Sequence, residues 1–262
     1  MKRQITVLDE VLTDYGISPH PSLVIPVEGA TEMFMMKKAM QLLHVPVSRN
    51  YIELFDIGGI NRDYAMLARF VAVPELGAAV GANLVRLRRP LTRFMVVTDA
   101  ESDFEMQAGR DKKKQEFVSA IFANLPAAYQ TPAARTEIDG LVEVDTWTQT
   151  ESFEFAHFTD VEIAAGIRAA YQAQGRPVPP VAPADIAPIR ARRGNLKTLF
   201  KTLPAPALDK LKLAEALWPT LQAHLDSHVR QGTVHDVPIG RVLGRAVQLA
   251  SLSFRRGVAL QI

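Results

Sequence analysis

The sequence contains no cysteine, few aromatic residues and almost no excess of charge of either sign. The lack of cysteine excludes disulfides, thiolate chemistry and Cys-ligated zinc, which favours hard oxygen ligands for any metal. The 30 Lys+Arg against 28 Asp+Glu give a net charge of only +2, so no general affinity for polyanions is implied. A nucleic-acid surface would therefore have to come from the local distribution of charge.

Long hydrophobic runs are also absent. No apolar stretch approaches the roughly 20 residues that a membrane span needs, and the start, "MKRQITVLDEVLTDYG", has acids where a signal peptide would be apolar. We therefore expect a cytoplasmic protein without a membrane partner. At 262 residues and 48% hydrophobic, the chain is long enough for one large domain, or for a core domain with an appended lobe.

The first half of the chain alternates between strand-like and helix-like segments. Short apolar or alternating runs predict strands, and Met33, Met36, Met40 and Leu43 have the spacing of a helix over 31–43. Strands separated by helices favour a mainly parallel sheet covered on both faces, that is, an α/β fold. The predicted strands are 22–27, 51–57, 92–98 and 140–148.

The second half has a different character. Thr159 and Glu162 have the spacing of a capping box, and Gly175 marks the end of the helix that they begin. Five prolines between 177 and 188 predict a stiff connector or surface arm, which should not be a helix interior. The rest reads as helical. We thus predict a core over 1–175, a Pro-rich connector over 176–189 and a helical C-terminal region over 190–262.

Acidic residues follow two of the predicted strands. Glu28 and Asp99 each stand at the carboxyl end of an apolar run, Glu32 is four residues beyond Glu28, and Glu101 is two beyond Asp99. In an open parallel sheet these ends form the edge where ligands bind. So many ionised carboxylates need divalent cations to share one site, and oxygen ligands suit Mg²⁺ or Mn²⁺. Two ions about 3.5–4 Å apart would clamp the attacking and leaving oxygens of a phosphodiester.

The motifs that carry these acids resemble a known family. "VEGATE", then "GG" after the intervening strand, and "TDAES" about seventy residues after the first motif resemble the Toprim domain of topoisomerases, primases and several nucleases. The likeness is greatest to the overcoming-lysogenisation-defect (OLD) nucleases and the related Gabija-type defence nucleases. This resemblance implies a Rossmann-like Toprim core in which Glu28, Glu32, Asp99 and Glu101 bind two catalytic Mg²⁺ or Mn²⁺ ions. Glu101 departs from the usual Asp-x-Asp pattern.

The likeness extends into the second half. "TESFEFAHFTDVEIAAGI" resembles the segment that completes the second metal site, with Ser152 and Glu154 as candidate ligands, and "LDKLKLAEAL" resembles the helix that bears a catalytic lysine. We assign that role to Lys212, with Lys210 as the alternative. The OLD nucleases resemble a nuclease fused to an ABC-type ATPase. Here no "GxxxxGK[ST]" motif occurs, so an ATPase partner would act in cis from a longer protein or in trans.

Some of these residues also have a simpler interpretation. Glu32 could be a first-turn acid favoured by the helix dipole, and Glu154 a solvated residue near a strand end. A basic stretch could contact DNA phosphates or be a solvated helix face. We assign to DNA binding Arg190, Arg192, Arg193 and Lys197. His157 and His235 are predicted to have structural roles.

These observations predict a divalent-metal-dependent DNA endonuclease that hydrolyses phosphodiesters with two metal ions, in DNA repair or anti-phage defence. The main alternative is a non-catalytic Toprim module that binds DNA or protein and works with a separate ATPase. A phosphoacceptor receiver domain also uses Mg²⁺ and a strand-end aspartate. However, it usually carries its acidic pair after the first strand of a shorter chain, so the "VEG" motif and the length fit it poorly.

Overall fold

The core of the protein is a parallel sheet. The computed structural model describes residues 21–27, 29–45, 52–56, 67–68, 70–71, 92–99, 107–148, 150–203 and 208–257. Within these residues four strands pair in the order β2-β1-β3-β4, and every pair is parallel. The α/β prediction with a Rossmann-like core is thus confirmed. The strands are β1 (Leu23–Val27), β2 (Ile52–Asp56), β3 (Arg93–Thr98) and β4 (Val142–Thr146).

The central strands are apolar because both of their faces are buried. Side chains alternate between the two faces of a strand. Ile25 of β1 and Val97 of β3 belong to one hydrophobic cluster, whereas Val24 and Val96 belong to another. Strands buried in this way are nearly continuous apolar runs, which is why 22–27 and 92–98 could be recognised from the sequence.

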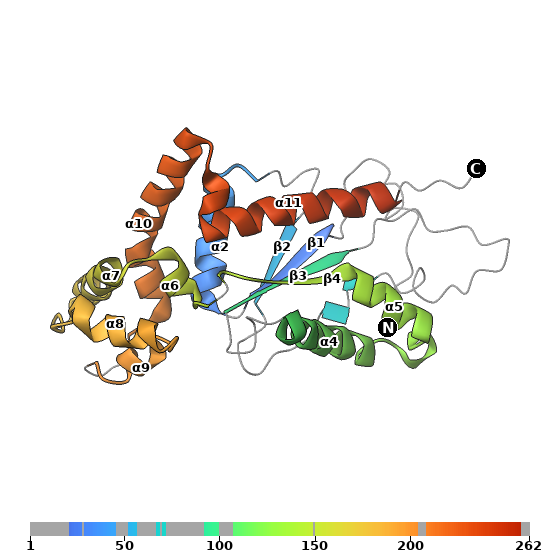
Figure 1. The fold of residues 1–262 in the computed structure, drawn as a ribbon, viewed down its shortest axis with the longest axis horizontal. Coiled ribbons are helices and arrows are strands. Elements are labelled where there is room, and N and C mark those ends of the chain that lie inside the picture. Colours follow the sequence, from blue (N-terminus) through green and yellow to red (C-terminus); the bar gives the residue numbers. More distant parts are fainter. Residues whose placement is uncertain are drawn as a thin grey trace.

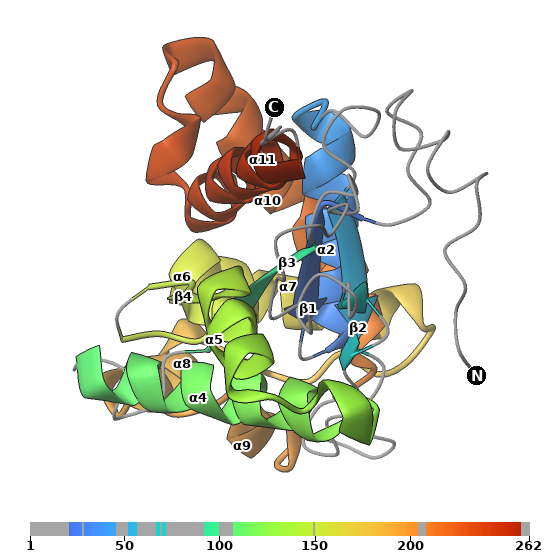
Figure 2. The same cartoon turned by 90° about the vertical axis from the view of Figure 1, so that its right-hand side faces the viewer.

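Helices cover both faces of the sheet (Figures 1 and 2). Two of them, α2 (Ala30–Leu42) and α11 (Pro238–Gly257), pack on the first cluster through residues such as Met36 and Ile239. The other face packs against α4 (Gln107–Ala123) and α5 (Pro132–Leu141) through Phe117 and Ile138. The predicted two-sided cover is therefore confirmed.

The helices after β4 form a second group beside the sheet (Figure 1). The capping box of Thr159 and Glu162 is present at the start of α7, and Gly175, with φ of 63°, lies just beyond its end, as predicted. The predicted helical character from Arg190 onward is confirmed. These helices are α6 (Phe153–His157), α7 (Asp160–Ala173), α8 (Pro183–Ala191), α9 (Lys197–Phe200) and α10 (Lys210–Gln231). A 3₁₀ turn at Val234–Asp236 follows α10, and another at Ala127–Tyr129 lies earlier in the chain, between α4 and α5.

The interpretation of the proline-rich segment needs a correction. Residues 176–182 have no regular structure, but α8 begins at Pro183 and has Pro188 inside it. Pro183 takes a first-turn position, where no N–H is needed. Pro188 removes one hydrogen bond from a short helix, and the complete burial of Ile186 in the first cluster offsets that loss. The expectation that this segment is no helix interior was therefore wrong for 183–188.

The three-part division of the chain stays a prediction. Buried side chains from before and after the proline-rich segment, including Tyr171 and Leu217, belong to one hydrophobic cluster.

In the part of the chain that the structure describes, no helix is both long and apolar enough to cross a membrane.

Candidate active site

The strand order creates a switch point between β1 and β3. These two strands lie side by side, with Leu23 paired to Arg93 and Val24 to Phe94, while β2 and β4 lie on opposite outer sides. In open α/β sheets ligands bind outside the carboxyl ends of the strands at such a point. Asp99 follows β3 directly at this edge. Two other predicted ligands, Glu28 and Glu101, lie outside the described residues.

Asp99 connects this edge to the start of α6. Its Oδ1 accepts a hydrogen bond of 2.7 Å from the backbone N–H of Phe153, which is 54 residues away in the sequence. Ser152 is the N-cap residue of α6, and its hydroxyl donates a 3.3 Å hydrogen bond to Oε2 of Glu154. The structure therefore brings together three predicted ligands, Asp99, Ser152 and Glu154, through the backbone of one short segment.

Glu32 is buried in the first turn of α2. Its side chain is only 7% exposed, and its Oε1 accepts a 3.2 Å hydrogen bond from the indole N–H of Trp147. A carboxylate that only complements the helix dipole would stay in water, because burying its charge is costly without compensating contacts. The structure thus places Glu32 in a specific, buried environment.

Trp147 was not among the predicted site residues. It directly follows the last residue of β4, and its ring packs edge-on against Phe153, with centroids 4.9 Å apart and an interplanar angle of 82°. Trp147 consequently contacts both Glu32 and the residue whose N–H binds Asp99. A signal was available in the sequence, since an aromatic residue at the end of a predicted strand lies at the same edge as the acids.

His157 anchors the other end of α6. Its Nδ1 lies 2.7 Å from the carbonyl oxygen of Phe153, and the backbone N–H of Ile239 donates a 3.0 Å hydrogen bond to its Nε2. Because Nε2 accepts, the neutral ring carries its proton on Nδ1 and donates to Phe153. Burial lowers the pKa of His157 from 6.5 to about 4, which keeps the ring neutral. The predicted structural role of His157 agrees with these contacts.

The donor set suits a hard divalent cation. Carboxylates of Glu32, Asp99 and Glu154 and the hydroxyl of Ser152 are all oxygen ligands, as Mg²⁺ and Mn²⁺ prefer. No group of three or more His, Asp or Glu side chains within the described ranges is arranged to hold a metal. The predicted ligands Glu28 and Glu101 lie outside these ranges.

Lys212 lies in the first turn of α10 and forms a local ion pair. Its Nζ is 2.8 Å from Oε2 of Glu215, one turn along the same helix, and this hydrogen bond raises the pKa of Lys212. Lys210 is exposed at the start of the same helix. Among the described residues no hydrogen bond or ion pair links Lys212 to Glu32, Asp99, Ser152 or Glu154.

The four residues predicted to bind DNA differ in their surroundings. The guanidinium of Arg190 makes ion pairs of 2.8 Å with both Glu151 and Asp160, and it donates to the backbone carbonyls of Phe155 and Phe158. These contacts fasten α8 to α6 and to the start of α7. The other three side chains, Arg192, Arg193 and Lys197, are exposed.

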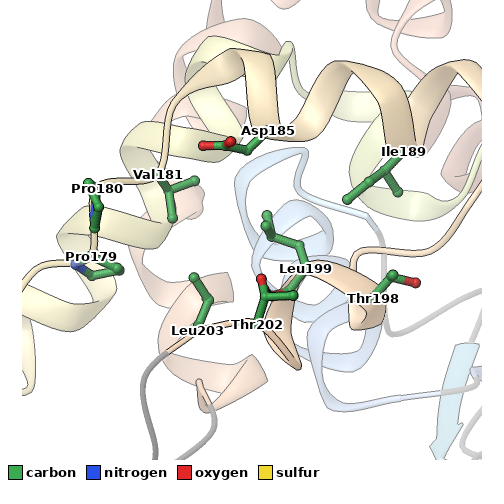
Figure 3. A pocket seen from close by; sticks show the side chains of 9 residues that line it. All are labelled: Pro179, Pro180, Val181, Asp185, Ile189, Thr198, Leu199, Thr202 and Leu203. Atoms are coloured by element: carbon green, nitrogen blue, oxygen red, sulfur yellow. Dashed lines mark hydrogen bonds between the residues drawn. The ribbon is translucent and has the colours of Figure 1, made fainter.

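Two hollows on the described part of the chain differ in their linings. A groove of about 1270 Å³ follows β4 as far as Trp147, and the charged pairs along it, such as Arg245 with Glu143 and Arg241 with Asp145, neutralise one another. A hollow of about 520 Å³ lies between 179–181, α8 and α9 (Figure 3). Its lining is mostly apolar, with Asp185 at its margin. Neither hollow offers the unpaired positive charge that a phosphate backbone would attract.

Comparisons of the chain with protein-family models, with curated proteins and with solved structures find no match. The Toprim resemblance therefore depends on the motifs quoted above.

Proposed function

We propose that this protein is a divalent-metal-dependent DNA endonuclease with a Toprim-like core. The observation that supports this best is the hydrogen bond between Asp99, at the switch point of the sheet, and the N–H of Phe153. It joins the strand-end acid to a segment that holds two further predicted oxygen ligands, Ser152 and Glu154. Buried Glu32 adds a fourth oxygen ligand from α2.

Each residue has a defined part in this proposal. Glu28, Asp99 and Glu101 would hold one ion, and Glu32, Ser152 and Glu154 a second. When bound, Mg²⁺ or Mn²⁺ would supply an activated water and stabilise charge on the leaving oxygen. The hydrogen bond from Phe153 orients the carboxylate of Asp99, and the hydrogen bond from the hydroxyl of Ser152 to Oε2 of Glu154 keeps these two side chains together. The ammonium group of Lys212 would offset charge that develops on the phosphate.

The proposal includes a substrate and a partner. DNA is the proposed substrate, with exposed Arg192, Arg193 and Lys197 as phosphate contacts. Since the chain has no P-loop motif, an ABC-type ATPase in cis or in trans is the proposed partner. We propose a cytoplasmic role in DNA repair or anti-phage defence.

The deciding experiment is an assay with supercoiled plasmid. We expect nicking or linearisation in Mg²⁺ or Mn²⁺ and none in EDTA, because all proposed ligands are hard oxygens. Calcium should support little turnover, since its looser geometry does not hold two oxygens in line. Undiminished cleavage in EDTA would contradict the proposal. Tight DNA binding without cleavage in either metal would favour the non-catalytic module, for which a buried Glu32 has no evident use.

A further inference from the structure

We infer that Trp147 is a positioning residue of the proposed metal site. It would fix the carboxylate of Glu32 directly and support that of Asp99 through Phe153. This inference rests on the proposed function, since it concerns the two acids assigned to metal binding. It adds a residue that neither the motifs nor the Toprim resemblance pointed to.

The contact with Glu32 is direct. An indole has a single N–H and no acceptor, so a buried tryptophan needs one acceptor at a fixed place. Trp147 is 1% exposed, and its N–H meets Oε1 of Glu32 at 3.2 Å, across 115 residues of sequence. A hydrogen bond to an ionised carboxylate is stronger than one between neutral groups. The indole therefore contributes to fixing the orientation of the Glu32 side chain.

The ring of Trp147 is held in place by its neighbours. It packs edge-on against Phe153 and, with centroids 5.5 Å apart and an angle of 69°, against His157. His157 is in turn fixed by its two hydrogen bonds to backbone groups of α6 and α11. Because close-packed aromatic rings leave little space for movement, the N–H cannot turn away from Glu32 without disturbing α6.

The second contact of the ring reaches Asp99. Phe153, against which the indole packs, donates its backbone N–H to Oδ1 of Asp99 at 2.7 Å. One side chain thus supports Glu32 in α2 and Asp99, which directly follows β3. Outer-shell groups that orient metal ligands typically contribute 10–100-fold to metal affinity. We expect an effect of that size for Trp147.

The first test uses the fluorescence of Trp147 itself and leaves its contacts unchanged. The chain has two tryptophans, Trp147 and Trp218, so the variant Trp218→Phe reports on Trp147 alone. Mg²⁺ added to this variant should change the emission in a saturable way, and the change should be absent in Trp218→Phe with Glu32→Ala. Emission that stays constant while calorimetry records saturating Mg²⁺ binding would overturn the inference.

The second test removes the N–H and keeps an aromatic ring. Trp147→Phe should bind Mg²⁺ about 10–100-fold more weakly by calorimetry, whereas the matched control Trp218→Phe should bind it as the wild type does. If Trp147 acts through Glu32, the two substitutions should not be additive. The double variant Trp147→Phe with Glu32→Gln should lose less Mg²⁺-binding free energy than the sum of the losses in the two single variants. Strictly additive losses would contradict the coupling.

The outcomes separate this inference from the proposed function. Wild-type Mg²⁺ affinity in Trp147→Phe, together with metal-dependent cleavage by the wild type, would remove the positioning role and leave the nuclease proposal intact. A wild-type protein that neither binds Mg²⁺ nor cleaves DNA would overturn both.

Discussion

Two acids near the carboxyl edge of the sheet, Asp99 and Glu32, and the basic residue Lys212 of α10 are held in different ways. Asp99 and Glu32 have hydrogen-bond partners 54 and 115 residues away, whereas Lys212 pairs with Glu215 three residues on. A local pair can form on almost any helix surface. A long-range bond between buried polar groups exists only if the whole fold positions both partners. A long-range hydrogen bond is thus a better indicator of a built site than a local ion pair.

The largest effect is expected at Asp99, whose partner is far away in the sequence, when its negative charge is removed. Asp99→Asn keeps an oxygen to accept the hydrogen bond from Phe153 but removes the negative charge, so cleavage should fall to background while the melting temperature changes little. Asp99→Ala should also lose cleavage and, by leaving the buried N–H of Phe153 unsatisfied, cost about 1–3 kcal/mol of unfolding free energy. Plasmid cleavage and thermal unfolding of both variants provide the measurement. An active Asp99→Asn would refute a metal-binding role for this residue.

Lys212 tests whether a residue with only a local partner can still be catalytic. If it stabilises the transition state, Lys212→Ala should slow single-turnover cleavage at saturating DNA by about 10²–10³-fold with little effect on DNA affinity.

Glu215→Ala is the matched control for Lys212, because it removes the same ion pair and keeps the lysine. If Lys212→Ala and Glu215→Ala both slow single-turnover cleavage only slightly and to the same extent, Lys212 has no role in the chemistry. A large effect of Lys210→Ala instead would move the assignment to Lys210.

Arg190 sharpens the comparison, because it is a basic residue with long-range contacts. Arg190→Met removes two ion pairs and two bonds to carbonyls, and we expect it to lower the unfolding free energy by about 2–3 kcal/mol. Urea unfolding at neutral pH is the measurement.

Exposed Arg192 is the control for Arg190. Arg192→Met should leave urea unfolding nearly unchanged. If this arginine contacts a DNA phosphate, the substitution should also reduce the slope of log DNA affinity against log salt concentration by about 1. Equal stability of the two variants would show that the contacts of Arg190 contribute little.

The smallest expected effect concerns pH and His157. Its pKa in the folded protein is about 4, below the ordinary 6.5, so below pH 6.5 the unfolded chain binds a proton that the folded chain does not. Stability should therefore be fully present above pH 6.5 and decrease as the pH falls towards 4. Between pH 7 and pH 5 the unfolding free energy should decrease by about 2 kcal/mol because of His157.

The measurement for His157 is urea unfolding at these two pH values. His157→Gln, which does not titrate, should show a smaller decrease than the wild type. A His157→Gln protein with the wild-type pH dependence would contradict the proposed origin of the effect.

Local features were predictable from the sequence because their causes are local. The apolar runs of β1 and β3, the capping box at Thr159 and the glycine stop at Gly175 all depend on residues within a few positions. The placement of Asp99 at the sheet edge also followed, since a residue directly after a parallel strand has nowhere else to lie. Glu28 and Glu101, outside the described residues, remain predictions.

The sequence by itself determined the α/β class, the position of Asp99 directly after β3 and the two ends of α7, because strand and helix periodicity and capping act over short stretches of chain. Only the tertiary structure decided that Glu32 is buried against Trp147, that Asp99 binds the start of α6 and that Arg190 fastens α8. It also made a helix of 183–191 despite Pro188, because the burial of Ile186 outweighs one missing hydrogen bond. These outcomes depend on side chains far apart in the sequence, whose proximity no local pattern encodes.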